Sequence, residues 1–188
     1  MEVYILRHGQ TAWSVSGQHT GHTDIPLTDE GRRQAEALGK RLQGIHFDHV
    51  WTSPSQRAQK TAEVAGLKAT VDPDLAEWDY GAYEGLTTPQ IQEKIPRWTL
   101  FTEGASQGES VAQMTARATR VVARLRATGG RIALVSSGHI SRAIAACWLG
   151  FTAAEGRCLL LSTASLSILG YEHQTPVLVA WNDTSHCY

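Results

Sequence analysis

The sequence has few of the features that mark membrane, secreted or nucleic-acid-binding proteins. No apolar stretch approaches the roughly 20 residues that a membrane-spanning helix needs. The N-terminus lacks the basic, apolar and small-residue pattern of a signal peptide. Lys and Arg number 17 against 18 Asp and Glu, so the formal net charge of −1 provides no overall positive field to recruit nucleic acid. We therefore expect a cytoplasmic protein that binds neither membrane nor nucleic acid.

Cysteine is also scarce. The three cysteines, Cys147, Cys158 and Cys187, are odd in number, widely separated and without the spacing of a metal site. We expect free thiols in a reducing compartment, and no metal or cofactor. Repeats, low-complexity tracts and linkers are lacking as well. The 188 residues are therefore expected to form one domain, 1–188, large enough to bury a substantial core.

What the sequence does contain is an alternation of strand and helix patterns. Continuous apolar runs at Val3–Leu6 and Ile132–Val135 are typical of strands covered on both faces. A long amphipathic helix is predicted from Ser110 to Gly129. The other predicted elements are a helix starting at Thr28, a strand at 49–51, a helix at 55–65, a strand within 68–75, a short helix at 89–97, a helix after Gly138 and strands at 165–171 and 177–181, with loops at 10–26 and 77–85. This order predicts an α/β three-layer sandwich with a mostly parallel central sheet and helices on both faces.

Arg7, His8 and Gly9 directly follow the first predicted strand. Open α/β sheets bind ligands at the carboxyl edge of their strands. Arginine offers a planar fork for phosphate, histidine can act as a nucleophile or base near neutral pH, and glycine lets the backbone come close. The triplet thus indicates a site for a phosphorylated ligand.

Later strand ends supply complementary groups. Arg57, in the first turn of a helix, gives a second guanidinium, and helix N-termini add N–H donors. A neutral imidazole between two arginines can attack phosphorus, because nearby cations disfavour its protonation. Glu77, among apolar neighbours that would raise its pKa, could protonate the leaving alkoxide. Further residues expected to bind substrate are Gln10, Ser14, Gln18, Thr20, Gly21, Tyr80, Gly138 and His139.

These motifs resemble those of the histidine phosphatase superfamily, in its phosphoglycerate mutase-like branch. The resemblance rests on Arg7-His8-Gly9-Gln10-Thr11, Thr20-Gly21, Thr52-Ser53-Pro54 with Arg57, Glu77 with Tyr80-Gly81, and Gly108-Glu109-Ser110. Within the family the chain is most similar to acid phosphatases and sedoheptulose bisphosphatases. The resemblance implies that His8 is the phosphorylated nucleophile, that Arg7 and Arg57 clamp the phosphoryl group, and that Glu77 donates the proton.

One position departs from the family pattern. Ser137 stands where the family has its second catalytic histidine, and His139 follows after Gly138. A hydroxyl can donate one neutral hydrogen bond but carries no imidazolium charge, and losing one preorganised donor typically costs about 10²–10³ in rate. Three explanations stay open here: an engineered inactivating substitution, a natural enzyme of low activity, or compensation by His139.

The predicted function is hydrolysis of a small phosphorylated metabolite, such as a phosphomonoester, sugar phosphate or bisphosphate, through a phosphohistidine at His8. Trp78 stands where mutases carry an arginine for the substrate carboxylate, which favours hydrolysis. The alternatives are a catalytically impaired phosphate-ligand binding protein and a phosphoglycerate mutase. The expected partner is a small phosphorylated substrate or inorganic phosphate, and a homodimer is left open.

Several nearby residues have less specific expectations. His19 and His22 are expected to be polar surface residues rather than metal ligands. Glu84 is expected to have a structural hydrogen-bonding role. The aromatic residues Trp13, Trp78 and Tyr83 fit either a substrate mouth or the core.

Overall fold

The computed structural model describes residues 1–187, whose strands form one six-stranded sheet in the order β3-β2-β4-β1-β5-β6. The strands are β1 (Glu2–Arg7), β2 (His49–Thr52), β3 (Thr70–Val71), β4 (Arg131–Ser136), β5 (Leu166–Glu172) and β6 (Thr175–Asp183). The pairs β1–β4, β4–β2 and β2–β3 are parallel, whereas β5 pairs antiparallel with both β1 and β6. The prediction of a mostly parallel central sheet is confirmed.

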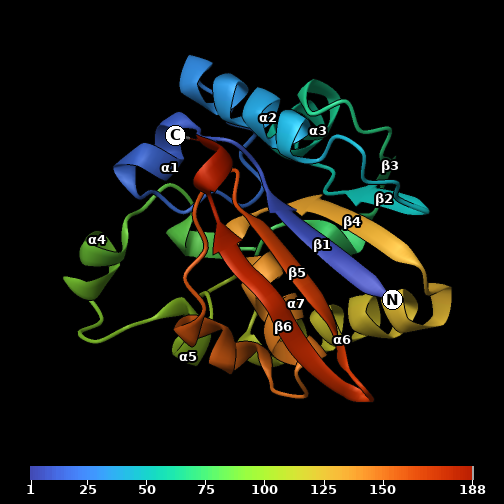
Figure 1. Ribbon diagram of the computed structural model, residues 1–188. Coiled ribbons are helices and arrows are strands. Elements are labelled where there is room, and N and C mark those ends of the chain that lie inside the picture. The colour runs from blue at the N-terminus through green and yellow to red at the C-terminus, as the bar shows by residue number, and fades with distance from the viewer. Residues whose placement is uncertain (188) are drawn as a thin grey trace.

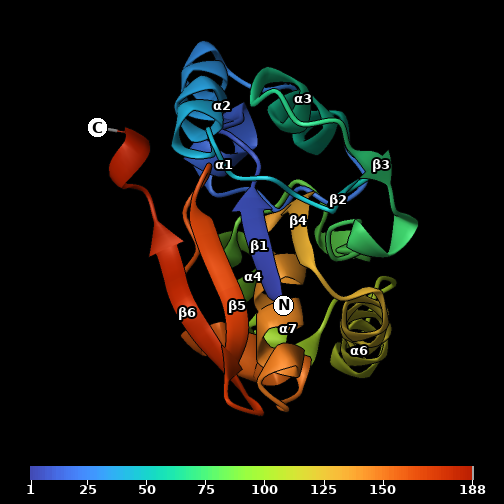
Figure 2. The same ribbon diagram turned by 45° about the vertical axis from the view of Figure 1, so that its right-hand side comes forward.

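Helices lie on both faces of this sheet. They are α1 (Ala12–Ser16), α2 (Asp29–Arg41), α3 (Gln56–Val64), α4 (Thr88–Gln92), α5 (Leu100–Glu103), α6 (Val111–Thr128) and α7 (Gly138–Trp148), with 3-10 turns at Pro73–Leu75, Gly81–Tyr83, Ala153–Cys158 and Ser185–Cys187. In Figure 1, α2 and α3 cover one face and α6 and α7 the other. Figure 2 shows β1 at the centre of the sheet between β4 and β5. The three-layer arrangement is therefore confirmed.

The central strands are apolar throughout because each face of the sheet meets a separate core. On β1, Tyr4 and Leu6 pack with Leu38 in the cluster beneath α2 and α3. Val3 and Ile5 belong to the larger cluster with α6 and α7. Successive side chains of a strand point to opposite faces, so a strand buried on both faces needs apolar residues at every position.

Three predictions, of a loop, a strand and a helix, need correction. Residues 10–26 contain α1, which begins at a reciprocal capping box between Thr11 and Ser14. Within 68–75 only Thr70–Val71 pairs with the sheet, because the chain turns into a 3-10 helix at Pro73. The short helix expected at 89–97 ends earlier, at Gln92.

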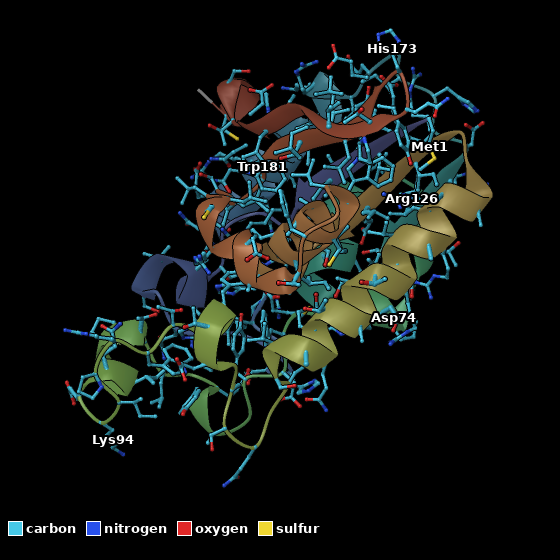
Figure 3. The ribbon with its side chains drawn as sticks, turned by 90° about the horizontal axis from the view of Figure 1, so that it is seen from below. Met1, Asp74, Lys94, Arg126, His173 and Trp181 are labelled. Carbon is cyan, nitrogen blue, oxygen red and sulfur yellow. The ribbon has the colours of Figure 1, made fainter. Side chains whose placement is uncertain are left out.

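The excursion between β3 and α6 is tied back to the body by arginines of α6. Arg120 and Arg124 form ion pairs with Asp74 at 2.9 and 3.0 Å, and Figure 3 shows Asp74 beside α6. Arg117 donates to the backbone oxygen of Ala76 at 2.6 Å. These contacts fix the segment that leads directly into residue 77. Farther along the excursion, Figure 3 shows Lys94 at a tip remote from α6.

Within residues 1–187, no helix has both the length and the apolarity needed to cross a membrane.

Candidate active site

The carboxyl ends of β1 and β4 lie side by side. Arg7 is in register with Ser136, and the backbone N–H of His8 donates to the Ser136 oxygen at 2.9 Å. The chain leaves β4 through Ser137 directly into α7. This pairing brings the residues after β1 next to the start of α7, as expected for a parallel sheet.

His8 is a buried, neutral imidazole with one free ring nitrogen. Its side chain is enclosed, with the residue 5% exposed, and Nδ1 lies 2.8 Å from the Gly9 carbonyl oxygen. Because a carbonyl can only accept, Nδ1 carries the proton and Nε2 keeps its lone pair. Burial lowers the pKa of His8 well below 6.5, and the charges of Arg7 and Arg57 lower it further. The ring is therefore available as a nucleophile.

Arg57 is 1% exposed and held by backbone carbonyls. Its guanidinium donates to the oxygens of Thr20 and Thr23 at 2.9 and 3.1 Å. Arg7 similarly donates to the Leu161 oxygen. Among the described residues neither arginine pairs with a carboxylate, and the Nε atoms of both are buried without a partner. Neutral carbonyls orient these two cations without a direct ion pair, which favours binding of an anion.

The carboxylate of Glu77 lies at the N-terminus of α7. Oε1 accepts hydrogen bonds from the backbone N–H groups of Trp78 and Ile140 at 2.9 and 2.8 Å. Oε2 accepts from the N–H of His139 at 2.9 Å. The expectation of an apolar environment is wrong for the oxygen atoms of this carboxyl group, because three backbone N–H groups donate hydrogen bonds to them.

Ser137 does not face the cavity. It occupies the cap position of α7 but makes no capping hydrogen bond through its side chain, since Glu77 already binds the first N–H groups of the helix. The residue is 1% exposed, and its hydroxyl lies 3.4 Å from Nη2 of Arg57. Ser137 therefore contacts the arginine clamp.

Backbone donors at helix starts are less free than expected. The N–H groups of His139 and Ile140 serve Glu77, and the N–H of Gln56 at the start of α3 donates to Asp24 at 3.0 Å. Binding of an anion at this site thus relies on the guanidinium groups.

A group of aromatic and imidazole rings forms one wall. Tyr80 Oη lies 2.6 Å from Nδ1 of His139. His19 is buried, stacks parallel to His139 with ring centroids 6.0 Å apart, and lies 2.7 Å from the Leu86 oxygen through Nδ1. The expectation of a surface role is wrong for His19, because its loop folds inward between α1 and the 77–85 segment. It holds for His22, which is exposed and lies 3.5 Å from Asp79.

These groups surround one cavity with a volume of about 210 Å³. The predicted site residues that line it are Arg7, His8, Ser14, Gln18, Thr20, Glu77, Tyr80, Gly138 and His139. The predicted residues Arg57 and Ser137 lie behind that lining.

Two predicted binding residues make structural hydrogen bonds away from the cavity lining. The side-chain oxygen of Gln10 accepts from Thr28, the cap of α2, at 2.9 Å. The N–H of Gly21 donates to Glu84 at 2.9 Å, so Glu84 has the hydrogen-bonding role expected of it. Neither Gln10 nor Gly21 lines the cavity.

Other residues that line the cavity were not predicted from the sequence. They are Thr11, Gly17, His19, Thr88, Arg142 and Leu161. Arg142 had a usable signal, since it follows Gly138 by one turn of a predicted helix and so lies on the same face. Three aromatic residues were expected either at a substrate mouth or in the core. Trp13 lines the cavity, Trp78 is fully buried in the core, and the partly buried Tyr83 packs against that core.

Comparisons with known proteins cover nearly the whole chain. A sequence profile of the histidine phosphatase superfamily (branch 1) matches residues 3–184. An acid phosphatase of Mycobacterium tuberculosis is 47% identical over 187 residues, 97% of this chain and 92% of the relative. The sedoheptulose 1,7-bisphosphatase of Saccharomyces cerevisiae is 36% identical over 180 residues, 78% of this chain and 66% of that relative.

A solved structure gives the same picture for the fold. The product of an open reading frame of Mycobacterium tuberculosis superposes with a TM-score of 0.93 at 45% identity, covering 96% of each chain. The structural similarity therefore covers nearly the whole chain.

Proposed function

The chain belongs to the histidine phosphatase superfamily and is a phosphatase, and we propose that it hydrolyses small phosphorylated metabolites through a phosphohistidine at His8. The observation that carries this proposal is the state of His8. Its ring is neutral, Nδ1 is occupied by the Gly9 carbonyl, and Nε2 is free at a cavity that also contains Arg7. A nucleophile so held needs no base to activate it.

The first step forms a phosphorus–nitrogen bond. His8 Nε2 attacks phosphorus, the bond to the ester oxygen breaks, and the electron pair leaves on that oxygen. Glu77, entering the step as the protonated acid, gives its proton to this oxygen so that an alcohol departs. Arg7 at the cavity wall stabilises the charge on the phosphoryl oxygens as it redistributes, and the positive charge of Arg57 behind that wall adds to this effect.

The second step releases phosphate. Water attacks the phosphohistidine while the Glu77 carboxylate takes a proton from that water. The phosphorus–nitrogen bond breaks, its electron pair returns to Nε2, and His8 is again neutral. Glu77 is protonated and ready for the next cycle, so the two steps balance.

The substrate class we propose is phosphomonoesters of small polar alcohols, including sugar phosphates and bisphosphates. The cavity of about 210 Å³ with polar walls supports a small metabolite. The similarity to an acid phosphatase and to a sedoheptulose 1,7-bisphosphatase supports the same class.

The test is hydrolysis of p-nitrophenyl phosphate and of a panel of sugar phosphates and bisphosphates, compared with His8→Ala. We expect the variant to lose nearly all turnover, and the parent protein to yield an acid-labile phosphoprotein when quenched with substrate. The exposed His46→Ala serves as the matched control and should keep full activity. Equal turnover by His8→Ala and the parent would contradict a phosphohistidine at this residue.

A second candidate is a phosphate-ligand binding protein with impaired turnover, favoured by serine at position 137. Calorimetric binding of phosphate or vanadate without hydrolysis of any panel compound would support it. A mutase is disfavoured because Trp78 is fully buried and its Nε1–H donates to the Glu109 oxygen, which leaves no cation there for a substrate carboxylate. Phosphate transfer within phosphoglycerate that is faster than phosphate release would reverse that preference.

We also propose that residues 1–188 act as one domain in the cytoplasm, which the three free thiols of Cys147, Cys158 and Cys187 support. Light scattering after size-exclusion chromatography will decide between a monomer and the homodimer left open by the sequence.

A further inference from the structure

With serine at position 137, the proposed phosphatase reaction lacks the hydrogen-bond donor that a histidine there would supply. Ser137 is 1% exposed, does not line the cavity, and its hydroxyl is directed to Arg57. A serine in this place cannot reach the phosphoryl oxygens in the way that a longer imidazole side chain can. Any replacement donor must therefore come from another residue that lines the cavity.

His139 lines the cavity two residues farther along the chain. Its backbone N–H is fixed to Glu77 at 2.9 Å, so its position is set by the same carboxylate that caps α7. The side chain is 27% exposed, in contrast to the 4% of Glu77, and the ring forms part of the cavity wall. The ring stacks on that of His19, with an angle of 8° between the two ring planes. It also packs against Phe101, whose ring centroid lies 5.4 Å from that of His139.

The hydrogen bond to Tyr80 determines which ring nitrogen of His139 carries the proton. The Tyr80 side chain is buried, and its oxygen lies 2.6 Å from Nδ1. Among residues 1–187, Nδ1 of His139 is the one hydrogen-bond partner of the Tyr80 hydroxyl, and buried donors are rarely left unpaired. We infer that the hydroxyl donates to Nδ1, which puts the ring proton on Nε2.

The His139 ring lines the cavity, and its Nε2 atom is accessible. It makes no hydrogen bond to another described residue, and it is not one of the buried nitrogen or oxygen atoms that lack a partner. An unpaired polar atom that is still accessible on a cavity-lining ring is positioned to meet a bound ligand.

Both members of the pair stay uncharged near neutral pH. Burial lowers the pKa of His139 well below 6.5, and Arg142, His19 and Arg7 lower it further. Burial raises the pKa of Tyr80 well above 10.0. The titratable and charged groups that face the His139 ring are Tyr80, Glu77, His19, Arg142 and Arg7.

We propose that the Nε2–H of His139, oriented by the Tyr80 hydroxyl, donates to the phosphoryl group the hydrogen bond that a histidine at position 137 would supply. This inference rests on the proposed phosphohistidine reaction at His8. It assigns His139 as a catalytic residue and Tyr80 as its positioning residue. The donor is neutral, so it stabilises the transition state without the extra charge of an imidazolium.

The experiment is a double-mutant cycle between positions 137 and 139. His139→Ala is measured in the parent and in Ser137→His, with kcat and KM for p-nitrophenyl phosphate. In the parent we expect a loss of about 10²–10³ in kcat and a smaller change in KM. In Ser137→His we expect the same change to cost less than about tenfold, because a second donor is then present. Equal losses in both backgrounds, or no loss in the parent, would overturn the proposal.

A second arm does not depend on Ser137→His folding. Tyr80→Phe removes the hydroxyl that holds Nδ1, so we expect kcat to fall about tenfold or more while phosphate binding persists. Tyr83→Phe is the matched control and should leave kcat unchanged, because Tyr83 packs beside Trp98 in the core. Equal rates for Tyr80→Phe and the parent would contradict the positioning role.

The protonation state of the His139 ring can be measured directly by NMR spectroscopy. In protein with ¹⁵N-labelled histidine, the signals absent from His139→Gln identify this residue. We expect a neutral ring protonated at Nε2 from pH 6 to 8, and a ring protonated at Nδ1 would overturn the assignment.

Failure of this inference is separable from failure of the proposed function. If His8→Ala abolishes turnover while His139→Ala leaves it intact, the phosphohistidine reaction stands and the His139 donor does not. If His8→Ala retains turnover, the proposed function itself fails.

Discussion

Glu77 accepts a 2.8 Å hydrogen bond from the backbone N–H of Ile140, a residue 63 positions away in the sequence. With the parallel contact to His139, the carboxylate caps α7 from outside that helix. The N-terminus of a helix is the end that stabilises negative charge. The same residue thus anchors α7 and provides the acid–base group of the proposed reaction, so its two roles should be separable by substitution.

Glu77→Gln should reduce turnover far more than stability. The amide keeps one acceptor oxygen for the backbone donors but cannot transfer a proton, so we expect kcat to fall by about 10²–10⁴. Glu77→Ala should also lower the free energy of unfolding by about 1–3 kcal/mol, because buried N–H groups lose their partner. Steady-state kinetics and urea unfolding measure the two effects. A Glu77→Gln enzyme with parental kcat would refute the acid–base role.

The buried histidines predict how stability depends on pH. His8, His19 and His139 each have a pKa lowered from the ordinary 6.5, so the unfolded chain binds more protons than the folded one as the pH falls below that value. The free energy of unfolding should therefore be highest above about pH 7, where these histidines are neutral in both states, and should decline progressively below about pH 6.5. Urea unfolding at a series of pH values from 8 to 5 measures this slope.

His139→Gln supplies the control for this linkage, since it removes one of the three groups. Its unfolding free energy should fall less steeply with decreasing pH than that of the parent. A parental slope in the variant would show that His139 titrates alike in the folded and unfolded states.

Arg57→Lys should weaken the site although it keeps the positive charge. A lysine amino group cannot replace the guanidinium that bridges the carbonyls of Thr20 and Thr23 and reaches Ser137. We expect kcat/KM to fall by about tenfold to 10³-fold, and phosphate affinity to fall with it. The exposed Arg32→Lys, on α2, is the control and should have parental kinetics. Parental phosphate affinity in Arg57→Lys would exclude the clamp.

His186→Ala tests whether the C-terminal turn supports the nucleophile. Nε2 of His186 lies 2.9 Å from the oxygen of Ala164, whose own N–H donates to the His8 oxygen at 3.0 Å. Ala164 has a φ of 53°, in the left-handed region that a residue other than glycine occupies only at a cost. Loss of His186 should lower the unfolding free energy by about 0.5–1.5 kcal/mol and reduce kcat. An effect no larger than that of His46→Ala would rule out this support.

Gly9→Ala should damage both stability and activity. A Cβ atom at residue 9 would lie 2.2 Å from the backbone oxygen of Gly31 in α2, and backbone cannot yield as a flexible side chain can. We expect a loss of about 1–3 kcal/mol in unfolding free energy, with displacement of the neighbouring His8. Thermal unfolding and kcat measure the effect, and an undisturbed Tm would contradict the close contact. The sequence predicted a glycine that lets the backbone come close, and the partner in the structure is a helix.

Much of the fold could be predicted from local pattern. The runs Val3–Leu6 and Ile132–Val135 predicted central parallel strands, because only a strand buried on both faces needs apolar residues throughout. The long helix from Ser110 was predicted for a similar reason, since its apolar face and capping serine are local. The helix α1 was missed because five residues present too little periodicity.

The sequence by itself determined which chemistry this protein is equipped for. Arg7 and His8 after a strand, followed along the chain by Arg57 and Glu77, predicted a phosphoryl-transfer site, because residue type and position at the end of an apolar run are local properties of the sequence. The tertiary structure alone decided how those groups are used. It turned Ser137 toward Arg57, brought Glu77 to the start of α7, and paired Tyr80 with His139. Hydrogen-bond partners and burial arise from segments far apart in the chain, so they exist only once the chain has folded.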